Sequence, residues 1–258
     1  MEKCTDKNKT ELLDFLKEAP EENCFFLGDL EQHSLSEECL DIWVNRREGT
    51  ITSALLRYYS YYSLYMPSPE DAPHVVAQLE TLDDKTSLAG LEKAISTVAD
   101  GLGREKLTVQ YLAALRPEHY NPLPPKHRVV RPCEEDAEAI LDFHIGIEEF
   151  SVTEADRGPA LRDIKINLPS TYLCYRNGKI VSSATLVAEN SQNGMVIGVA
   201  TSREERGQGY ARAALTELCN DLTARGKAAI LFYGNPDAGK LYRSLGFREI
   251  GRWARLSF

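Results

Sequence analysis

The chain has 258 residues, of which 43% are hydrophobic and 27% charged, the composition of an ordinary soluble globular protein. This length fits one large domain or two small ones. The six cysteines are scattered without a C-x-x-C pair, so neither a disulfide scaffold nor a metal site is expected. We instead expect reduced thiols in a cytoplasmic protein. No apolar run approaches the roughly 20 residues of a membrane span, and the first residues lack the apolar stretch of a signal peptide. The sequence disfavours secreted, collagenous, disordered and membrane proteins.

Charge is unevenly distributed along the chain. The net charge of −9 opposes broad binding to nucleic acid or to an anionic membrane. Residues 1–125 carry 12 basic and 22 acidic residues, whereas residues 126–258 carry 18 and 17. An anionic ligand is therefore expected on the second part of the chain.

The first half reads as alternating helices and strands that end in a proline-rich segment. Apolar periodicity predicts helices over 9–17, 71–80 and 87–102, and strands over 42–44, 51–56, 58–66 and 107–115. Strand alternation would place Tyr59, Tyr61 and Tyr65 on one sheet face and Tyr58 and Tyr62 on the other, as an ordinary aromatic strand or as a wall for a substrate or an interface. Four prolines in residues 116–125 predict an extended linker.

The second half has a similar order of elements. We expect a short strand over 127–131, helices over 134–150, 153–166, 209–225 and 237–245, and strands over 171–175, 180–188, 195–201, 228–233 and 249–256. Hairpins combined with strand–helix units indicate a mixed α/β (α+β) fold. Each half should hold a central, mixed, mostly antiparallel sheet that is flanked by helices.

Two hairpins match at an offset of half the chain. Arg47-x-Gly49-x-Ile51-x-Ser53 and Arg176-x-Gly178-x-Ile180-x-Ser182 are 129 residues apart. Turns of this type are common between strands, so chance is one explanation. The similar order of elements around both hairpins favours the other, a duplicated layout.

The most informative stretch is a glycine turn between a β-rich run and an alanine-rich helix. Gly207 and Gly209 allow the backbone to approach a ligand closely and to direct several N–H groups at one point. The N-terminus of the following helix adds unpaired N–H groups and the positive end of its dipole. The sequence therefore predicts a pyrophosphate cradle, although a turn that merely caps the helix would also need these glycines. The P-loop and dinucleotide fingerprints are both absent.

Two segments carry a family resemblance. Residues 206–211 (RGQGYA) resemble the R/Q-x-x-G-x-G/A signature of the GNAT superfamily of acyl-CoA-dependent N-acyltransferases, and residues 235–247 (NPDAGKLYRSLGF) are similar to its N-x-x-A-x-x-L-Y-x-x-x-G-F segment. The resemblance covers about residues 127–258. Residues 1–116 share the implied layout but lack a glycine cradle, because the corresponding turn reads Pro67-Ser68-Pro69-Glu70-Asp71.

The resemblance implies the roles of individual residues. The cofactor-binding residues would be Val199, Ala200 and Thr201 along the pantetheine arm, Arg206, Gly207, Gln208, Gly209, Tyr210, Ala211 and Arg212 at the pyrophosphate, and Asn235 at the cofactor arm. Tyr242 would protonate the departing thiolate, which suits a phenol with a pKa near 10. Alternatively, Tyr242 packs on the sheet and Asn235 caps a helix. Gly246 and Phe247 are expected to be structural.

The proton of the acceptor amine needs a carrier. The candidates are Glu148, Glu149 and Glu189, each of which is otherwise a solvated surface carboxylate, and an ordered water could serve instead. His144 is a further possible base or a structural histidine. No Ser-His-Asp or Cys-His arrangement is readable, so direct transfer is favoured over an acyl-enzyme.

The sequence thus predicts a tandem GNAT-like enzyme. Its parts would be a degenerate GNAT-like domain over 1–116, a linker over 117–126 and a catalytic acetyltransferase domain over 127–258. It would transfer an acetyl or other acyl group from acetyl-CoA to an amine of a small molecule or peptide, without a metal and without nucleic-acid or membrane partners. The alternative is a non-catalytic acyl-CoA sensor or scaffold whose first domain binds a partner. The acceptor and the oligomeric state are not indicated.

Overall fold

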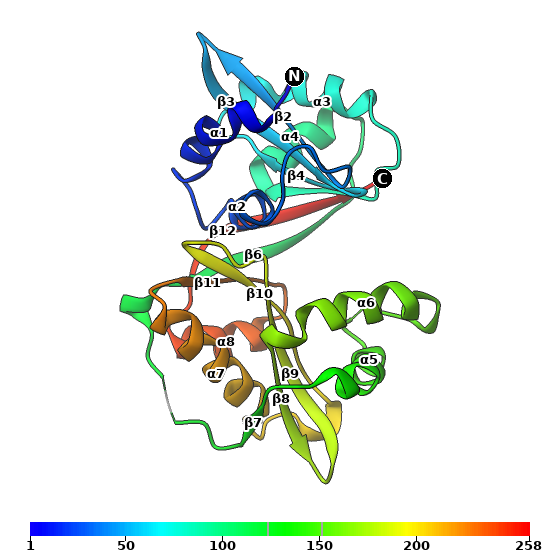
Figure 1. The fold of residues 1–258 in the computed structure, drawn as a ribbon, viewed down its shortest axis with the longest axis vertical. Coiled ribbons are helices and arrows are strands. Elements are labelled where there is room, and N and C mark those ends of the chain that lie inside the picture. Colours follow the sequence, from blue (N-terminus) through cyan, green and yellow to red (C-terminus); the bar gives the residue numbers. More distant parts are fainter. Residues whose placement is uncertain (123, 151) are drawn as a thin grey trace. The chain divides into compact units, whose positions relative to one another are not determined.

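The structure is a computed structural model, which describes all residues from 1 to 258 except Leu123 and Ser151 (Figure 1). Leu123 belongs to the predicted linker and lies outside the described residues, and Pro117–His119 of that segment form a short 3-10 turn. The first half contains β1 Glu2–Lys3, α1 Lys9–Leu16, α2 Cys24–Gln32, β2 Leu40–Arg47, β3 Thr50–Tyr58, β4 Tyr61–Tyr65, α3 Ala72–Glu80, β5 Ser87–Leu91, α4 Glu92–Gly101 and β6 Leu107–Leu115. The second contains β7 Val129–Val130, α5 Ala137–Ile145, α6 Arg157–Asn167, β8 Thr171–Arg176, β9 Lys179–Val187, β10 Asn193–Thr201, α7 Tyr210–Ala224, β11 Ala228–Tyr233, α8 Pro236–Leu245 and β12 Arg248–Ser257.

The two halves repeat one order of elements: a short strand, two helices, three strands, a helix, a strand, a helix and a strand. The predicted tandem mixed α/β layout is confirmed. The hairpins match in register as well. In β2–β3, Asn45 pairs with Ser53 and a register shift follows before Arg46; in β8–β9, Cys174 pairs with Ser182 and the same shift follows before Tyr175. All of these positions are 129 residues apart, so the duplication extends to an irregularity of the backbone.

The chain divides into two compact units, each of which is made of more than one segment of the sequence. The first unit contains Met1–Ala113, Phe232–Pro236 and Glu249–Phe258, and the second contains Ala114–Leu231 and Asp237–Arg248. Residues 249–258 belong to the first unit because β12 pairs antiparallel with β5, from Trp253 opposite Leu91 to Ser257 opposite Ser87. The linear boundaries predicted above therefore differ from the compact units, since they leave the last strand in the second domain.

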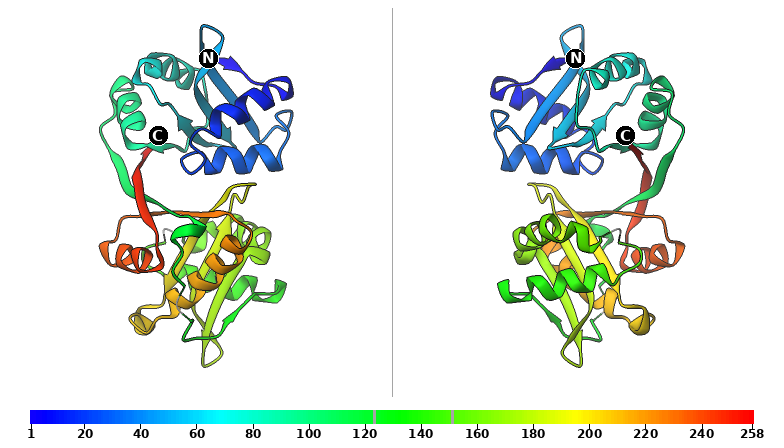
Figure 2. Two further views of the ribbon diagram at one scale, coloured as in Figure 1. Left: turned by 90° about the vertical axis from the view of Figure 1, so that its left-hand side faces the viewer. Right: turned by 90° about the vertical axis from the view of Figure 1, so that its right-hand side faces the viewer.

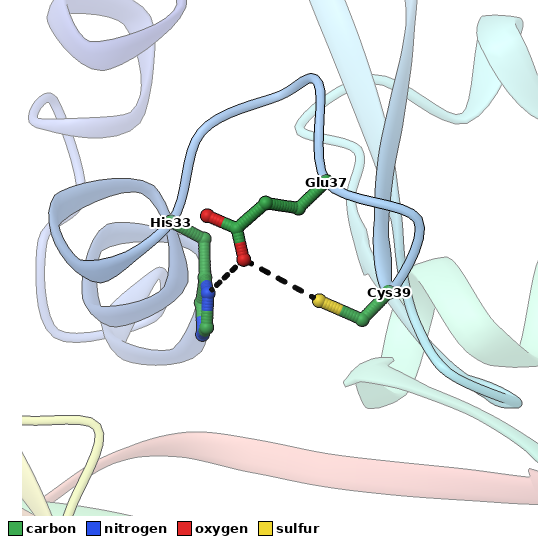
Figure 3. A group of neighbouring side chains, drawn as sticks. All are labelled: His33, Glu37 and Cys39. Atoms are coloured by element: carbon green, nitrogen blue, oxygen red, sulfur yellow. Dashed lines mark hydrogen bonds and ion pairs between the residues drawn. The ribbon is translucent and has the colours of Figure 1, made fainter.

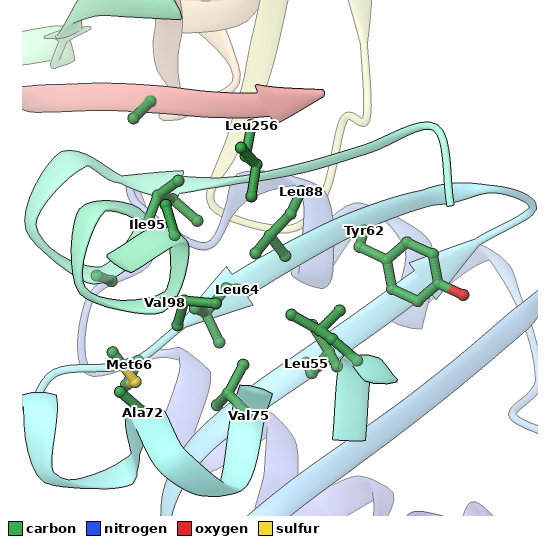
Figure 4. Packing of buried hydrophobic residues seen from close by; sticks show 14 of the residues in the cluster. Leu55, Tyr62, Leu64, Met66, Ala72, Val75, Leu88, Ile95, Val98 and Leu256 are labelled. Atoms are coloured by element: carbon green, nitrogen blue, oxygen red, sulfur yellow. The ribbon is translucent and has the colours of Figure 1, made fainter. Parts of the chain in front are cut away.

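The first unit has helices on both faces of its strands (Figures 1 and 2). Its strand order is β1-β2-β3-β4-β5-β12-β6. Helices α1 and α2 pack on one face through Leu12, Leu16, Phe26, Leu27 and Leu30. Helices α3 and α4 pack on the other face against Leu55, Leu64 and Leu88, a cluster to which Leu256 of β12 contributes (Figure 4).

The second unit is layered in the same way around β11-β10-β9-β8-β7. Helices α5 and α6 pack on one face, where Ile140, Leu168 and Leu173 form a cluster. Helix α7 covers the opposite face, where the Cys174 thiol lies 3.6 Å from the Tyr210 carbonyl oxygen. Leu173 and Cys174 therefore point to opposite faces, as strand alternation requires. Among the described pairs of the second unit, β7 with β8, β8 with β9 and β9 with β10 are antiparallel, whereas β10 and β11 run parallel.

Two predictions of secondary structure were wrong, and one helix was missed. Residues 87–102 form strand β5 followed by helix α4 rather than one helix. Residues 58–66 do not form one strand, because the chain reverses between Tyr58 and Tyr61, which pair across a hairpin. Helix α2 was not predicted. The reversal also corrects the tyrosine faces: Tyr62 is buried toward α3 and α4, whereas Tyr58 and Tyr65 pack on the α1–α2 side.

The expected structural role of Gly246 follows from its contacts. It ends α8 with φ of +105°, and a Cβ placed there would lie 2.0 Å from the His119 carbonyl oxygen. Only glycine fits such a backbone approach in the left-handed region.

Candidate functional site

The site is organised around a bulge in β10. The pairing of β10 with β9 shifts register between Ile197 and Ala200, and Gly198 has φ of +62°. Two hydroxyls of β9 hold the distorted segment: the Ser183 hydroxyl donates to the Gly198 carbonyl at 2.7 Å, and the Ser182 hydroxyl donates to the Ala200 carbonyl at 2.5 Å. The bulge therefore turns backbone groups of β10 away from the regular ladder. Both serines were missed as site residues, although two adjacent polar residues within an otherwise apolar strand were a signal.

The other edge of β10 is paired only at its start. Its ladder with β11 runs from Asn193 opposite Ala228 to Met195 opposite Ile230. Within the described part of the chain this ladder has no later pair, so the segment that contains Val199, Ala200 and Thr201 presents backbone groups on that edge. These are the residues expected to line a pantetheine arm, and an extended chain of amide groups suits such an edge.

The glycine turn follows the C-terminal end of β10. Gly207 and Gly209 have φ of +77° and +92°, and Gly209 is the N-cap residue of α7. Along α7, the first N–H group that donates to a carbonyl of this turn belongs to Ala213, and its acceptor is the Gly209 carbonyl oxygen. Among the described residues, no backbone acceptor is found for the N–H groups of Gly207 to Arg212. The turn and the first turn of α7 therefore form a cluster of donors at the positive end of a helix.

Arg212 strengthens this cluster. Its Nη2 atom donates to the Ser244 hydroxyl at 2.6 Å, while its Nη1 atom is buried and has no hydrogen-bond partner among the described residues. A buried guanidinium nitrogen without an acceptor is costly in an unliganded protein. An anion at the start of α7 would supply that acceptor.

The turn is fixed by its neighbours. The His127 ring stacks on Tyr210 with centroids 3.8 Å apart, and its Nε2 atom lies 2.8 Å from the Gln208 carbonyl oxygen. Arg176 forms an ion pair with Glu205 and donates to the Gln208 side chain at 3.1 Å. Arg206 donates through Nε to the Thr201 carbonyl at 3.1 Å, which ties the turn to the end of β10. Sequence reasoning included Arg206 and Gln208 but missed His127 and Arg176, which are remote in sequence.

The corresponding turn of the first unit has the opposite chemistry. Arg47, the counterpart of Arg176, forms ion pairs with Glu70 and Asp71 at the start of α3. Asp71 is buried, and its Oδ2 atom has no hydrogen-bond partner within the described residues. The protein's own carboxylates thus lie at this helix start, where a bound phosphate would be repelled.

A cavity of about 180 Å³ lies beside the bulge. Its walls come from α5, α6 and the strands, and they include His144, Asp163, Thr171, Thr185, Ile197 and Gly198. Most of this lining is apolar, and Asp163 is exposed. The cavity can therefore hold a small, partly apolar molecule next to the distorted backbone of β10.

His144 connects the cavity to the bulge. Its Nε2 atom lies 3.3 Å from the Ser183 hydroxyl, and its ring contacts Phe143 and Phe150. Since the Ser183 hydrogen is donated to Gly198, the neutral imidazole must donate from Nε2 and carry its lone pair on Nδ1. Burial lowers the pKa of His144 to about 4, so the ring is neutral at physiological pH.

This shift predicts an acid-dependent loss of stability. Because the His144 pKa is lower in the folded than in the unfolded chain, the unfolded chain binds more protons between about pH 4 and 6.5, and stability falls as pH falls through that window, by at most about 3 kcal/mol. Burial raises the pKa of Asp29 to about 7, which has the opposite effect over much of the same range. The measurement is therefore the difference between wild type and His144→Gln in urea unfolding at about pH 7 and about pH 5. The variant should lose less stability on acidification, and parallel losses would contradict the assignment.

The three predicted carboxylates lie in different places. Glu148 pairs with Arg203 at 3.4 Å, and Glu149 pairs with Arg206 at 2.9 Å, so both reach the glycine turn. The hydrogen bond from Arg206 lowers the pKa of Glu149. Glu189 instead forms ion pairs with Arg225 and Lys227 near the start of β10 and β11, at the opposite end of β10 from the turn. The structure therefore brings Glu148 and Glu149 to the turn but not Glu189.

Asn235 and Tyr242 of the segment 235–247 lie just before α8 and within α8, respectively. Asn235 is exposed and immediately precedes α8, in the segment that groups with the first unit. Tyr242 is buried within α8, and its ring meets Phe247 edge-on at 5.8 Å. The Tyr242 ring therefore packs on Phe247, and both its catalytic role and its packing on the sheet remain predictions.

Comparison with known families identifies the second part of the chain. Residues 137–247 match the model of the acetyltransferase (GNAT) family. This segment is a GNAT acetyltransferase domain. It contains the bulge, the glycine turn and Tyr242, and its fold is that of proteins that transfer acyl groups from acyl-CoA. A search of curated proteins gives no significant match.

Solved structures extend the likeness of fold to the whole chain. An X-ray structure of a Drosophila protein matches with a TM-score of 0.70 at 13% identity, covering 98% of this chain and 97% of that one. A GNAT-family acetyltransferase from Colwellia psychrerythraea matches with a TM-score of 0.62 at 13% identity and covers 100% of both chains. A tandem GNAT protein from the clavulanic acid biosynthesis pathway gives 0.57 at 13% identity over 99% and 97%. At these identities the likeness concerns the fold, and that fold is the tandem GNAT layout.

No helix within the described residues is both long and apolar enough to cross a lipid bilayer.

Proposed function

We propose that this protein transfers an acetyl group from acetyl-CoA directly to an amine, using the second unit. The observation that carries the proposal is the group of donors at the glycine turn: within the described residues, the N–H groups of Gly207 to Arg212 have no backbone acceptor and the buried Nη1 atom of Arg212 has no hydrogen-bond partner. A pyrophosphate would satisfy these donors. Val199, Ala200 and Thr201 would then contact the pantetheine arm.

The cavity beside the bulge is the proposed acceptor site. Its apolar lining favours an amine that carries an apolar part, and Asp163 would attract the cationic form at the rim. Such an amine must lose a proton before it attacks the thioester. Glu149, which forms an ion pair with Arg206, is the proposed carrier, with Glu148 as a second exposed carboxylate. The lowered pKa keeps Glu149 ionised and able to accept a hydrogen bond, and an ordered water would connect it to the amine and carry the proton onward to solvent.

Direct transfer needs one more proton, for the departing thiolate. We propose Tyr242 as its donor, since a phenol and a thiol of similar acidity exchange a proton without a large cost. The first unit lacks a glycine cradle and carries Glu70 and Asp71 at the start of α3, the helix that corresponds to α7. It is therefore proposed to be non-catalytic.

An acceptor screen tests this function. The full-length protein is incubated with acetyl-CoA and a panel of small apolar amines, amino acids, aminoglycosides and peptides, and thiol release is measured together with the acetylated product. At least one amine with an apolar part should give turnover above the rate of acetyl-CoA hydrolysis. Saturable acetyl-CoA binding with no product across the panel would instead support the sensor or scaffold alternative.

A further inference from the structure

A second group of reactive side chains lies in the first unit, between α2 and β2. His33 is the C-cap residue of α2, Glu37 lies in the loop that follows, and Cys39 directly precedes β2. Their side chains point toward one another (Figure 3). His33 Nδ1 lies 2.9 Å and Cys39 Sγ lies 3.9 Å from Glu37 Oε2. One nitrogen, one sulfur and one oxygen atom thus lie within 4.8 Å of one another.

This set of atoms suits a divalent ion of the zinc type. Zinc binds nitrogen, oxygen and thiolate sulfur at about 2.0 to 2.3 Å, so two ligands on one tetrahedral ion lie roughly 3.3 to 3.8 Å apart. The observed separations of 2.9 and 3.9 Å bracket that range. Magnesium and calcium prefer oxygen ligands alone, so the imidazole and the thiol select against them.

The three ligands are already positioned by other contacts. Glu37 Oε1 accepts a hydrogen bond from the Ser34 N–H at 2.8 Å, which leaves Oε2 directed at the group. The His33 ring packs on Tyr58 with centroids 5.6 Å apart. The Cys39 carbonyl accepts from the Tyr59 N–H at 2.8 Å, which fixes the start of β2. Supporting contacts of this kind orient metal ligands in known sites.

The group is open to solvent on the side of Glu37. A cavity of about 550 Å³ adjoins Glu37, and its lining also includes Glu38 and Asp41, of which Asp41 forms ion pairs with Lys3 and Arg57. Glu37 is exposed, so a hydrated ion can reach it without unfolding. Residues 1–125, which contain the site, hold the excess of acidic residues in the chain.

We propose that His33, Glu37 and Cys39 bind one Zn²⁺ or similar divalent transition-metal ion, with water completing its coordination. On binding, the ion forms bonds to His33 Nδ1, a Glu37 oxygen and Cys39 Sγ, and the thiol proton passes to solvent. The ion joins the end of α2 to the start of β2 and thereby stabilises the first unit. This site is separate from the glycine turn and independent of the proposed acyl transfer. It replaces the expectation from sequence that no metal is bound, which rested on the lack of a C-x-x-C pair.

Cobalt substitution tests the site. The full-length protein, reduced and free of affinity tags, is titrated with Co²⁺ and then with Zn²⁺. One equivalent of Co²⁺ should produce a thiolate-to-cobalt charge-transfer band, and Zn²⁺ should remove that band by displacement. His33→Ala and Glu37→Gln should each weaken binding at least about tenfold. Zinc should also protect Cys39 from alkylation, while Cys133, the exposed cysteine of the second unit, stays reactive.

Two further variants separate ligation from folding. Cys39→His should retain one equivalent of metal but lose the charge-transfer band, because nitrogen replaces sulfur. Glu38→Gln, which neutralises a neighbouring carboxylate that is not a proposed ligand, should leave the charge-transfer spectrum unchanged and should weaken affinity by less than about tenfold. A band that persists in Cys39→Ser, or the absence of any band in the wild type, would overturn the proposal.

Discussion

Replacing Gly209 with glutamate is expected to abolish the thermal protection of this protein by acetyl-CoA. The new carboxylate would stand at the N-cap of α7, among the donors proposed to hold the pyrophosphate. Two like charges about 4 Å apart at a protein surface repel by roughly 4 kcal/mol, which corresponds to a loss of affinity of nearly 1000-fold. The measurement is the shift of the unfolding temperature with increasing acetyl-CoA. The wild type should be stabilised and the variant should not.

A matched variant controls for backbone strain. Gly209 has φ of +92°, so any side chain there costs about 1–2 kcal/mol regardless of charge. Gly226 has φ of +71°, lies just beyond the other end of α7, and would place a Cβ in open space. Gly226→Glu should therefore reduce stability by a similar amount yet keep full protection by acetyl-CoA. Equal protection of Gly209→Glu would contradict the placement of the pyrophosphate.

Local sequence patterns predicted most elements but failed where distant strands decide the conformation. Residues 87–91 continue an apolar pattern that reads as part of the following helix. They form a strand because β4 pairs with them on one side and β12 on the other, and β12 is about 160 residues away in sequence. Gly90 was the available signal: a Cβ there would lie 2.5 Å from the Leu64 carbonyl oxygen, so the position requires glycine for close strand packing.

Helix α2 and the tyrosine hairpin were missed for other reasons. The run over 24–32 begins with four consecutive apolar residues, continues with a glycine and has its polar residues near its end, so it shows little of the periodicity by which a surface helix is recognised. The hairpin reverses at Tyr59, which has φ of +53°, an uncommon conformation for a bulky residue. A sequence without glycine or proline at that point reads as a continuous strand.

The candidate site was predictable only in its local part. The glycine turn is contiguous, so its residues could be named from sequence, and the structure describes donors there. The bulge of β10 depends on hydroxyls of Ser182 and Ser183 in another strand, and His127 joins the turn from about 80 residues away. Glu189 was selected because it follows a strand, but strand direction places it at the opposite end of β10. Such contacts follow from topology, which the pattern of a single strand does not contain.

Removal of one hydroxyl should separate binding from chemistry. In Tyr242→Phe, acetyl-CoA should still protect the protein against heat, because Tyr242 lies outside the glycine turn and its buried ring still packs on Phe247. The kcat should fall by about 100-fold or more with little change in KM, since a proton donor acts in the transition state rather than in binding. The measurement is steady-state thiol release with the best acceptor from the panel.

The matched control is Tyr175→Phe, which removes a hydroxyl that bonds to Asp136 at 3.0 Å in the same unit. It should change stability slightly and turnover hardly at all. If Tyr242→Phe retains the wild-type kcat while Gly209→Glu loses acetyl-CoA binding, Tyr242 is a packing residue and the thiolate leaves without its help. If the kcat values of Tyr242→Phe and Tyr175→Phe both fall along with the stability of these variants, the loss of activity reflects damage to the fold. A fall in kcat that is confined to Tyr242→Phe supports proton donation by this hydroxyl, because only the proposed donor has then been removed.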